Sequence, residues 1–307
     1  MQDPCSLQRQ NRMTTDKPSQ LSLVHKYPIA SFSILALSLG AGTAYLVVLG
    51  VLGSGLALAS ALSASVAGII VTAIVDGRDG LKLMAKRLLI WRVGIGYWVF
   101  AILLLFPTIL LGSLVNPLFG GDAVSFGDVK PTLNIVPMFI VFVIVAGLGQ
   151  ELGWTGFLLP RLQTRFDALR ACVIRAVIGG IWHLPLFIYS KLWPSAFPDF
   201  PYAGWIAQKG FLVAIMAALM FLLSWSILLG WMFNNTRGSL LLVSILHGSE
   251  IWVAYWMLSA GIDSNNLDNY WGYGAVMVLI ALIIVVTTGS QNLSRKHKRI
   301  VCQSSVE

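Results

Sequence analysis

The feature that most constrains the fold is a long charge-free stretch near the start of the chain. Between Lys26 and Asp76 the sequence contains no Asp, Glu, Lys or Arg. A membrane-spanning helix needs about 20 mostly apolar residues, so this stretch is long enough for two spans, joined by a turn at Gly50–Gly55. Only 11% of all residues are charged, against about 25% in soluble proteins. With a mean hydropathy of +0.78, lipid is predicted to be the main solvent of this chain.

Eight apolar segments follow one another along the chain. They predict an all-α fold, a polytopic membrane bundle of about eight transmembrane helices. The third segment should be kinked at Pro107. Arg170 and Arg175 lie at the start of the fifth, and we expect both to extend toward the membrane surface. The Gly- and Ala-rich second segment predicts a close helix-packing face. The predicted helices are Ile29–Gly50, Gly55–Val75, Val93–Leu114, Leu133–Leu159, Leu169–Tyr189, Gly210–Phe233, Ser239–Ala260 and Trp271–Thr288.

The distribution of basic residues predicts the orientation in the membrane. If the N-terminus is inside, only Lys130, Lys191 and Lys209 of the 21 lysines and arginines fall in outer loops. This asymmetry follows the positive-inside rule and places both termini in the cytosol. We therefore attribute the net charge of +8 to topology and not to nucleic-acid binding. The predicted location is a bacterial plasma membrane, with the lipid bilayer as the surrounding partner.

The organisation predicted from these segments is simple. Residues 1–28 are polar and are predicted to form a disordered cytosolic tail. Residues 29–289 form the transmembrane helical domain, and residues 290–307 form a basic cytosolic tail.

Two acids and two histidines fall inside the predicted spans: Glu151, His183, His247 and Glu250. Charged groups are costly at mid-membrane and usually face a polar cavity. Counted from Arg161, Arg175 and Arg237 as surface markers, the first three lie roughly 15, 12 and 15 Å deep at 1.5 Å per residue. Glu250 follows His247 by one helical turn, about 4.5 Å deeper and on the same face.

A carboxylate and two imidazoles at one level can bind a divalent metal or activate a water molecule. A single intramembrane histidine would more simply be a hydrogen-bonding strut between helices. Two histidines and two glutamates together favour a functional site. The candidate metal ligands are His183, His247 and Glu151, for a divalent ion such as zinc; the alternative is that the site holds no cofactor.

Three segments around these residues carry a family resemblance. They are 150–163 (QELGWTGFLLPRLQ), 180–187 (GIWHLPLF) and 239–248 (SLLLVSILHG). In order and spacing they resemble the three motifs of the CPBP family, the prenyl (CAAX) endoproteases and their bacterial relatives, also called the Abi or bacteriocin-processing group. The resemblance covers about residues 70 to 255, with a protease-like core at about 133–260.

The resemblance implies an intramembrane endopeptidase of about eight helices, acting on a membrane-embedded or prenylated peptide. It implies that the first Glu of a Glu-Glu-x-x-x-Arg motif acts as general base on a water, helped by the histidine of the second motif. The histidine of the third motif, with an Asn or similar residue four positions later, would stabilise the oxyanion.

This chain departs from that pattern at four positions. The first Glu is replaced by Gln150, and the Arg by Thr155. Gly179 stands where the family has an aromatic residue before the second-motif histidine, and Ile251 where it has the Asn-like residue. The change at position 150 matters most, because an amide can orient a water but cannot take its proton.

The neighbouring carboxylate cannot simply replace the missing one. Successive helix positions point about 100° apart, so Glu151 could face the site only through a local twist, which Gly149 and Gly153 make conceivable. With Thr155 in place of the arginine, Glu151 also needs another cation, a metal or a proton. Glu250 is an additional carboxylate that the family pattern does not require.

Three functional hypotheses follow. The first is an active intramembrane protease, with His183 and His247 at the site, Glu151 or Glu250 as base, and Gln150 orienting the water. The second is a weak or inactive relative that binds membrane peptides or lipidated tails, as in bacteriocin immunity or regulation. The third is a transporter that uses the same polar cluster, which is disfavoured because no paired, broken spans are predicted.

Overall fold

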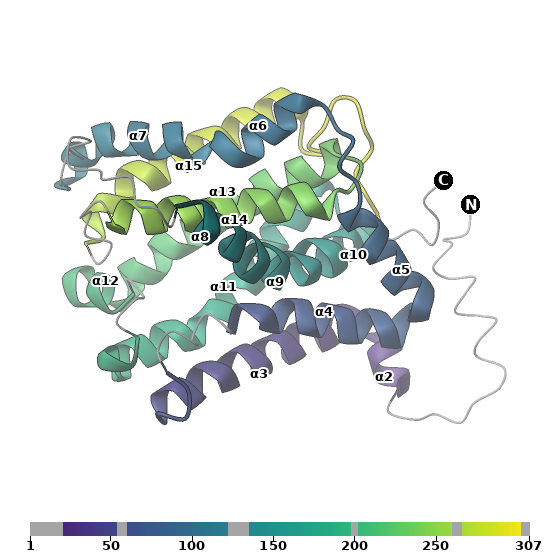
Figure 1. The fold of residues 1–307 in the computed structure, drawn as a ribbon, viewed down its shortest axis with the longest axis horizontal. Helices are drawn as coiled ribbons and strands as arrows, with labels where there is room; N and C mark the ends of the chain where they lie inside the picture. Colours follow the sequence, from purple (N-terminus) through teal and green to yellow (C-terminus); the bar gives the residue numbers. More distant parts are fainter. Residues whose placement is uncertain (1–20, 54–59, 122–134, 198–201, 260–265, 302–307) are drawn as a thin grey trace.

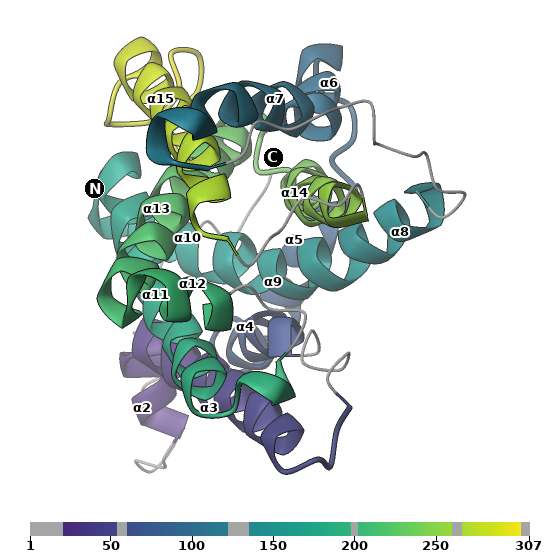
Figure 2. The ribbon, with the colours of Figure 1, turned by 90° about the vertical axis from the view of Figure 1, so that its left-hand side faces the viewer.

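The computed structural model describes residues 21–53, 60–121, 135–197, 202–259 and 266–301. Within these ranges the regular structure is helical throughout, without strands. Most of the long helices run side by side (Figure 1), and a view turned by 90° shows many of them close to end-on (Figure 2). The predicted all-α polytopic bundle is confirmed.

The elements include α-, 3₁₀- and π-helical segments. In chain order they are α2 (Leu21–Lys26), α3 (Pro28–Val48), α4 (Leu62–Val75), α5 (Gly77–Leu88), α6 (Ile95–Leu103), α7 (Leu105–Val115), η2 (Asn116–Phe119), α8 (Ile135–Phe142), η4 (Val143–Leu148), α9 (Gly149–Glu151), η5 (Leu152–Leu158), α10 (Leu159–Arg165), α11 (Ala168–Leu192), η6 (Pro194–Ala196), α12 (Tyr202–Lys209), α13 (Phe211–Asn235), α14 (Leu240–Ser259) and α15 (Asp268–Thr288).

Five helices in the described part are long and apolar enough to cross a membrane. They are Pro28–Val48, Val136–Arg165, Ala168–Leu192, Phe211–Asn235 and Asp268–Thr288. The pair α6 and α7 forms a sixth candidate span, and shorter apolar helices occupy Leu62–Val75 and Leu240–Val253. Each of the eight predicted segments therefore overlaps one of these helices or the bent pair, and the chain is a multi-pass integral membrane protein.

The third predicted span is bent, as expected. Helices α6 and α7 meet at Leu104 at an angle of 43°. Proline has no N–H to donate, and its ring clashes with the carbonyl four residues earlier, which for Pro107 is that of Leu103. The bend therefore lies one helical turn before the proline that causes it.

Several elements were not predicted from the sequence. Helix α5 forms where a loop was expected, and it buries Met84 and Arg87 while Lys82 and Lys86 stay exposed. It lies at the same end of the bundle as α2 (Figure 1). Helix α2 lies inside the predicted N-terminal tail, whose residues 1–20 fall outside the described part.

The predicted C-terminal tail is packed against the bundle as far as residue 301. Leu293 is fully buried. The Gln163 amide donates to the Ile300 carbonyl oxygen at 2.7 Å, and the Asn234 amide donates to the Asn292 carbonyl oxygen at 3.0 Å. Residues 302–307 fall outside the described part.

The segment from α8 to α10, residues 135–165, forms one continuous central helix. Its η5 part packs on α4, and its η4 part packs on α14. Phe32 from α3 stacks on Phe157 with ring centroids 5.0 Å apart, and meets the edge of Trp154 at 5.4 Å. The central helix is therefore held between the N-terminal helices and α14.

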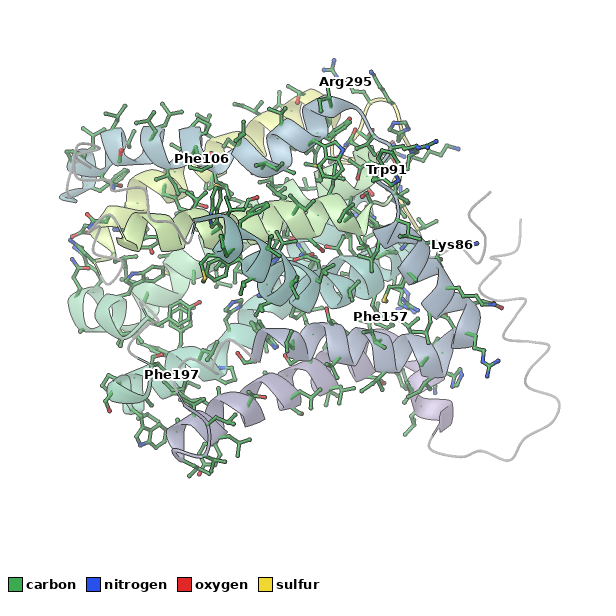
Figure 3. All side chains as sticks on the ribbon, in the orientation of Figure 1. Lys86, Trp91, Phe106, Phe157, Phe197 and Arg295 are labelled. Carbon is green, nitrogen blue, oxygen red and sulfur yellow. The ribbon has the colours of Figure 1, made fainter. Side chains whose placement is uncertain are left out.

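Side-chain positions agree with the predicted sidedness. Lys86, Trp91 and Arg295 lie toward the end of the bundle that carries α5, whereas Phe197 lies toward the opposite end (Figure 3). Basic residues far apart in sequence thus gather at one end, as the positive-inside distribution requires.

The orientation can be tested with accessibility tags. Tags at residue 10 and after Glu307 should both be reachable from the cytosol, whereas a tag between Asp263 and Asp268 should be reachable only from the outside. Labelling of intact and permeabilised cells measures this. Termini found on opposite sides of the membrane would contradict the span assignment.

Candidate active site

The central helix departs from α-helical geometry on both sides of Glu151. The segments η4 and η5 are π-helical, and the short α9 lies between them. π-Helical turns, with i→i+5 hydrogen bonds, are rare and occur frequently at functional sites. Their wider turn changes the direction of the side chains that follow. The local twist that Glu151 would need is therefore present in the backbone.

Small residues hold this distorted helix against its neighbours. A Cβ on Gly153 would lie 2.1 Å from the carbonyl oxygen of Ala64 in α4, and a Cβ on Gly147 would lie 2.2 Å from that of Ser244 in α14. The Ser65 hydroxyl donates to the Leu148 carbonyl oxygen at 2.7 Å, which satisfies a polar group of the π-helical segment. The predicted packing face of the Gly- and Ala-rich segment is thus confirmed on α4.

Glu151 is fully buried and forms an ion pair with Arg175 of α11. Arg175 Nη2 lies 3.1 Å from Oε1 and 3.0 Å from Oε2. The Thr155 hydroxyl also donates to Oε2. The sequence suggested that Glu151 needs a cation, a metal or a proton as partner, and the structure supplies a cation, Arg175.

The position of Arg175 corrects the sequence analysis. This residue was expected to extend toward the membrane surface, but it is only 6% exposed. Its Nη1 donates to Ser226 Oγ of α13 at 3.1 Å. A buried arginine cannot mark the membrane surface, so the depth of His183 that was measured from Arg175 is too small.

His247 of α14 is held by the same carboxylate. Its Nδ1 lies 2.8 Å from Glu151 Oε1. An ionised carboxylate only accepts hydrogen bonds, so Nδ1 carries the proton. In the neutral ring Nε2 then keeps its lone pair. The edge of the Trp225 ring contacts this imidazole, with centroids 5.8 Å apart.

His183 of α11 has the same tautomer for a different reason. Its Nδ1 lies 2.8 Å from the Gly179 carbonyl oxygen. A carbonyl can only accept, so Nδ1 is the donor and Nε2 is again free in the neutral ring. Trp182 packs edge-on against this ring at 4.7 Å and is fixed by a 3.0 Å hydrogen bond to Ser63.

The side chains of His183 and His247 lie near each other. His183 and His247 are close enough to interact electrostatically, and Glu250 interacts electrostatically with His247. Tyr202 of α12 lies within reach of the Glu250 charge: burial first and that charge second raise the pKa of its hydroxyl. The motif residues thus gather from the central helix, α11 and α14.

Two polar side chains at the site stay uncommitted. Gln150 and Glu250 are both half-buried. Neither side chain forms a hydrogen bond with another residue in the ranges that the structure describes. They are therefore free to interact with a water molecule or a substrate.

The described residues do not form an evident metal site. In the described ranges, no three His, Cys, Asp or Glu side chains are grouped so that they could hold a metal ion. Both oxygens of Glu151 already accept from Arg175, and Oε1 also accepts from His247. In this arrangement the Glu151 carboxylate orients the His247 ring. Zinc binding by His183, His247 and Glu151 stays a prediction.

Comparison with known proteins gives a family match over the part of the chain that holds this site. Residues 132–253 match the family described as type II CAAX prenyl endopeptidase Rce1-like. This segment contains Glu151, His183 and His247. By this match, the segment is similar to the CAAX prenyl endopeptidases. The resemblance seen in the three sequence motifs is therefore confirmed.

A relative shows the same relationship over a longer stretch. Across 150 residues the chain is 26% identical to CAAX prenyl protease 2 of Methanococcus maripaludis. The aligned region covers 48% of this chain and 51% of that protein. The chain thus spans about half the length of the curated relative that it matches.

Sequence reasoning missed two partners of the site, Arg175 and Ser226. Arg175 gave only a weak signal, because it lies near the start of its apolar segment but five residues deeper than Arg170. Ser226 gave no signal of its own, since serines are common in membrane helices and mostly bond to their own backbone.

The close packing of the central helix gives a testable prediction. Gly153→Ala should destabilise the protein by about 1–3 kcal/mol, since its Cβ would collide with the backbone of α4. Gly42→Ala is the matched control, because nothing lies within 4 Å of its Cβ on the exposed side of α3. Thermal unfolding in detergent measures both. Equal unfolding temperatures for the two variants would contradict the packing argument.

Proposed function

We propose that the chain is an intramembrane endopeptidase of the CAAX type that hydrolyses a peptide bond in a prenylated, membrane-bound peptide. The observation that carries this proposal is the convergence of the three family motifs on one buried site. Glu151 and His247 are joined by a hydrogen bond, and His183 lies within electrostatic reach. The name of the relative, CAAX prenyl protease 2, supports the substrate class.

Peptide hydrolysis needs a group that takes a proton from water and later returns one to the leaving amine. The neutral His247 ring offers such a group, because Nδ1–H is engaged by Glu151 and Nε2 keeps its lone pair. A carboxylate that fixes the tautomer and orientation of a histidine is the arrangement of hydrolytic triads. In this proposal Glu151 positions His247 and is not itself the base.

The remaining site residues complete the proposal. His183 presents a second Nε2 lone pair that can hold the same water, since its Nδ1 is tied to Gly179. The Gln150 amide, free in the described part of the chain, orients that water through its donor and acceptor groups. Glu250 lies near His247 and assists electrostatically.

A second candidate function is binding without efficient cleavage. The observation that favours it is Gln150, which stands where the family has its basic carboxylate. Glu151 cannot replace that carboxylate while both of its oxygens are engaged. A membrane peptide or lipidated tail would then be held at the site and released uncut.

Gln150→Glu separates these two functions. Supplying a general base typically changes a rate by about 10²–10⁴-fold, so a gain of that order indicates an enzyme crippled at this position. If His247 already acts as base, the variant should cleave no faster, or more slowly because two adjacent carboxylates are crowded. Cleavage of a panel of prenylated peptides in proteoliposomes measures the rate.

The controls for this experiment lie within the same site. Gln150→Glu combined with Thr155→Arg restores the family pattern. If this variant also fails to cleave, the result would favour binding without cleavage. Cleavage that persists after His183 and His247 are both changed to Ala would show that the activity comes from elsewhere.

Glu250→Gln tests the identity of the base. The exchange keeps the shape of a side chain that has no hydrogen-bond partner in the described region, so the fold should be preserved. If His247 is the base, cleavage should fall only a few-fold, roughly as expected for a charge acting at a distance. His247→Gln should abolish it. A loss of about 10²–10⁴-fold in Glu250→Gln would instead make Glu250 the base.

A further inference from the structure

We infer that Arg175 is a positioning residue that takes the place of the missing motif-one arginine, reaching Glu151 from a different helix. Through Glu151 it holds His247 in its reactive orientation. This inference rests on the proposed function, because the consequence of the positioning is hydrolysis. It assigns a role to a residue that lies in none of the three motifs.

The geometry shows that positions 155 and 175 converge on one atom. The Thr155 hydroxyl and Arg175 Nη2 both donate to Glu151 Oε2. An arginine four residues after Glu151 could pair with the same carboxylate, because side chains at i and i+4 lie on one face of a helix. The family motif has its positive charge at position 155 on the central helix. Here Arg175 of α11, twenty positions further along the chain, supplies that charge.

Arg175 is itself fixed from a second side. Its Nη1 donates to Ser226 Oγ at 3.1 Å, and that hydroxyl donates to the Cys172 carbonyl oxygen at 2.8 Å. The guanidinium is therefore clamped between α13 and the central helix. An arginine that paired with Glu151 only incidentally would not be expected to have this second hydrogen bond to Ser226.

The energetics favour positioning over stabilisation. Desolvating two charges offsets most of their attraction, so a buried ion pair adds little net stability compared with apolar residues of similar volume. What the pair does supply is a fixed direction. Glu151 Oε1 accepts from Arg175 at 3.1 Å and from His247 Nδ1 at 2.8 Å, so the carboxylate cannot rotate without breaking both contacts.

The test is to move the cation back to its motif position. Arg175→Met should lower kcat by about 10- to 100-fold, the range found when a hydrogen-bonding partner behind a metal-bound histidine is lost, while KM changes little. Adding Thr155→Arg to Arg175→Met should recover most of that loss. Arg170→Met is the matched control, since this exposed residue of the same helix pairs with Asp167 and, among the described residues, lies away from Glu151.

A second readout does not depend on cleavage. The chain has four histidines, so NMR shifts of the imidazole nitrogens can be assigned with single substitutions. The His247 ring should show the Nδ1–H pattern in the original protein and in the double variant, and a different pattern in Arg175→Met. A merely structural ion pair would change the unfolding temperature and leave these shifts unaltered in the folded fraction.

The outcomes separate the two claims. If the original protein does not cleave, the proposed function fails, and the His247 shifts still decide the role of Arg175. Unaltered His247 shifts in Arg175→Met would overturn the inference. The inference would also be overturned if the double variant Arg175→Met with Thr155→Arg failed to recover the His247 shifts and, in a protein that cleaves, failed to recover kcat.

Discussion

The ion pair between Glu151 and Arg175 is the interaction on which the rest of the site depends. A carboxylate with no exposed surface is tolerated only when it is paired and hydrogen-bonded. Arg175 pairs with it from α11, Thr155 and His247 complete its hydrogen bonds, and Ser226 anchors the arginine from α13. Four separate parts of the chain must therefore be in place before Glu151 can be buried, which ties the geometry of the histidine to the packing of the bundle.

The π-helical segments explain how one helix can serve this arrangement. In a regular α-helix the side chains at 151 and 155 lie on one face and that at 150 about 100° away. The π-turns on both sides of α9 change these directions, and the carbonyl groups they displace need partners. Ser65 supplies one of these, and Gly147 and Gly153 allow the backbones of α14 and α4 to approach closely. The distortion is therefore supported by the neighbours and is a feature of the fold.

Much of this was predictable, because hydrophobic length and the cost of buried charge act locally along the sequence. The spans, the kink near Pro107 and the gathering of Glu151, His183 and His247 follow from such local rules. The role of Arg175 did not follow from local rules. An arginine near a helix end can either extend toward the membrane surface or pair with a charge inside the bundle, and only tertiary packing decides between the two. Helix α5 was missed because a short mixed run between two spans is typical of a loop, and π-helical geometry leaves no periodic signal in the sequence.

The occupied carboxylate also restricts what the reaction can use. Glu151 cannot orient His247 and accept a proton from water at the same time, since both of its oxygens already accept hydrogen bonds. Position 150 cannot accept the proton either, because an amide has no useful basicity. In the proposed hydrolysis, proton transfer would then pass through an imidazole nitrogen or through Glu250. Both imidazoles are held through Nδ1, but His247 is held by a carboxylate that Arg175 and Thr155 fix in turn. A carboxylate also stabilises the imidazolium that forms when Nε2 takes a proton, which is why we favour His247 as the base.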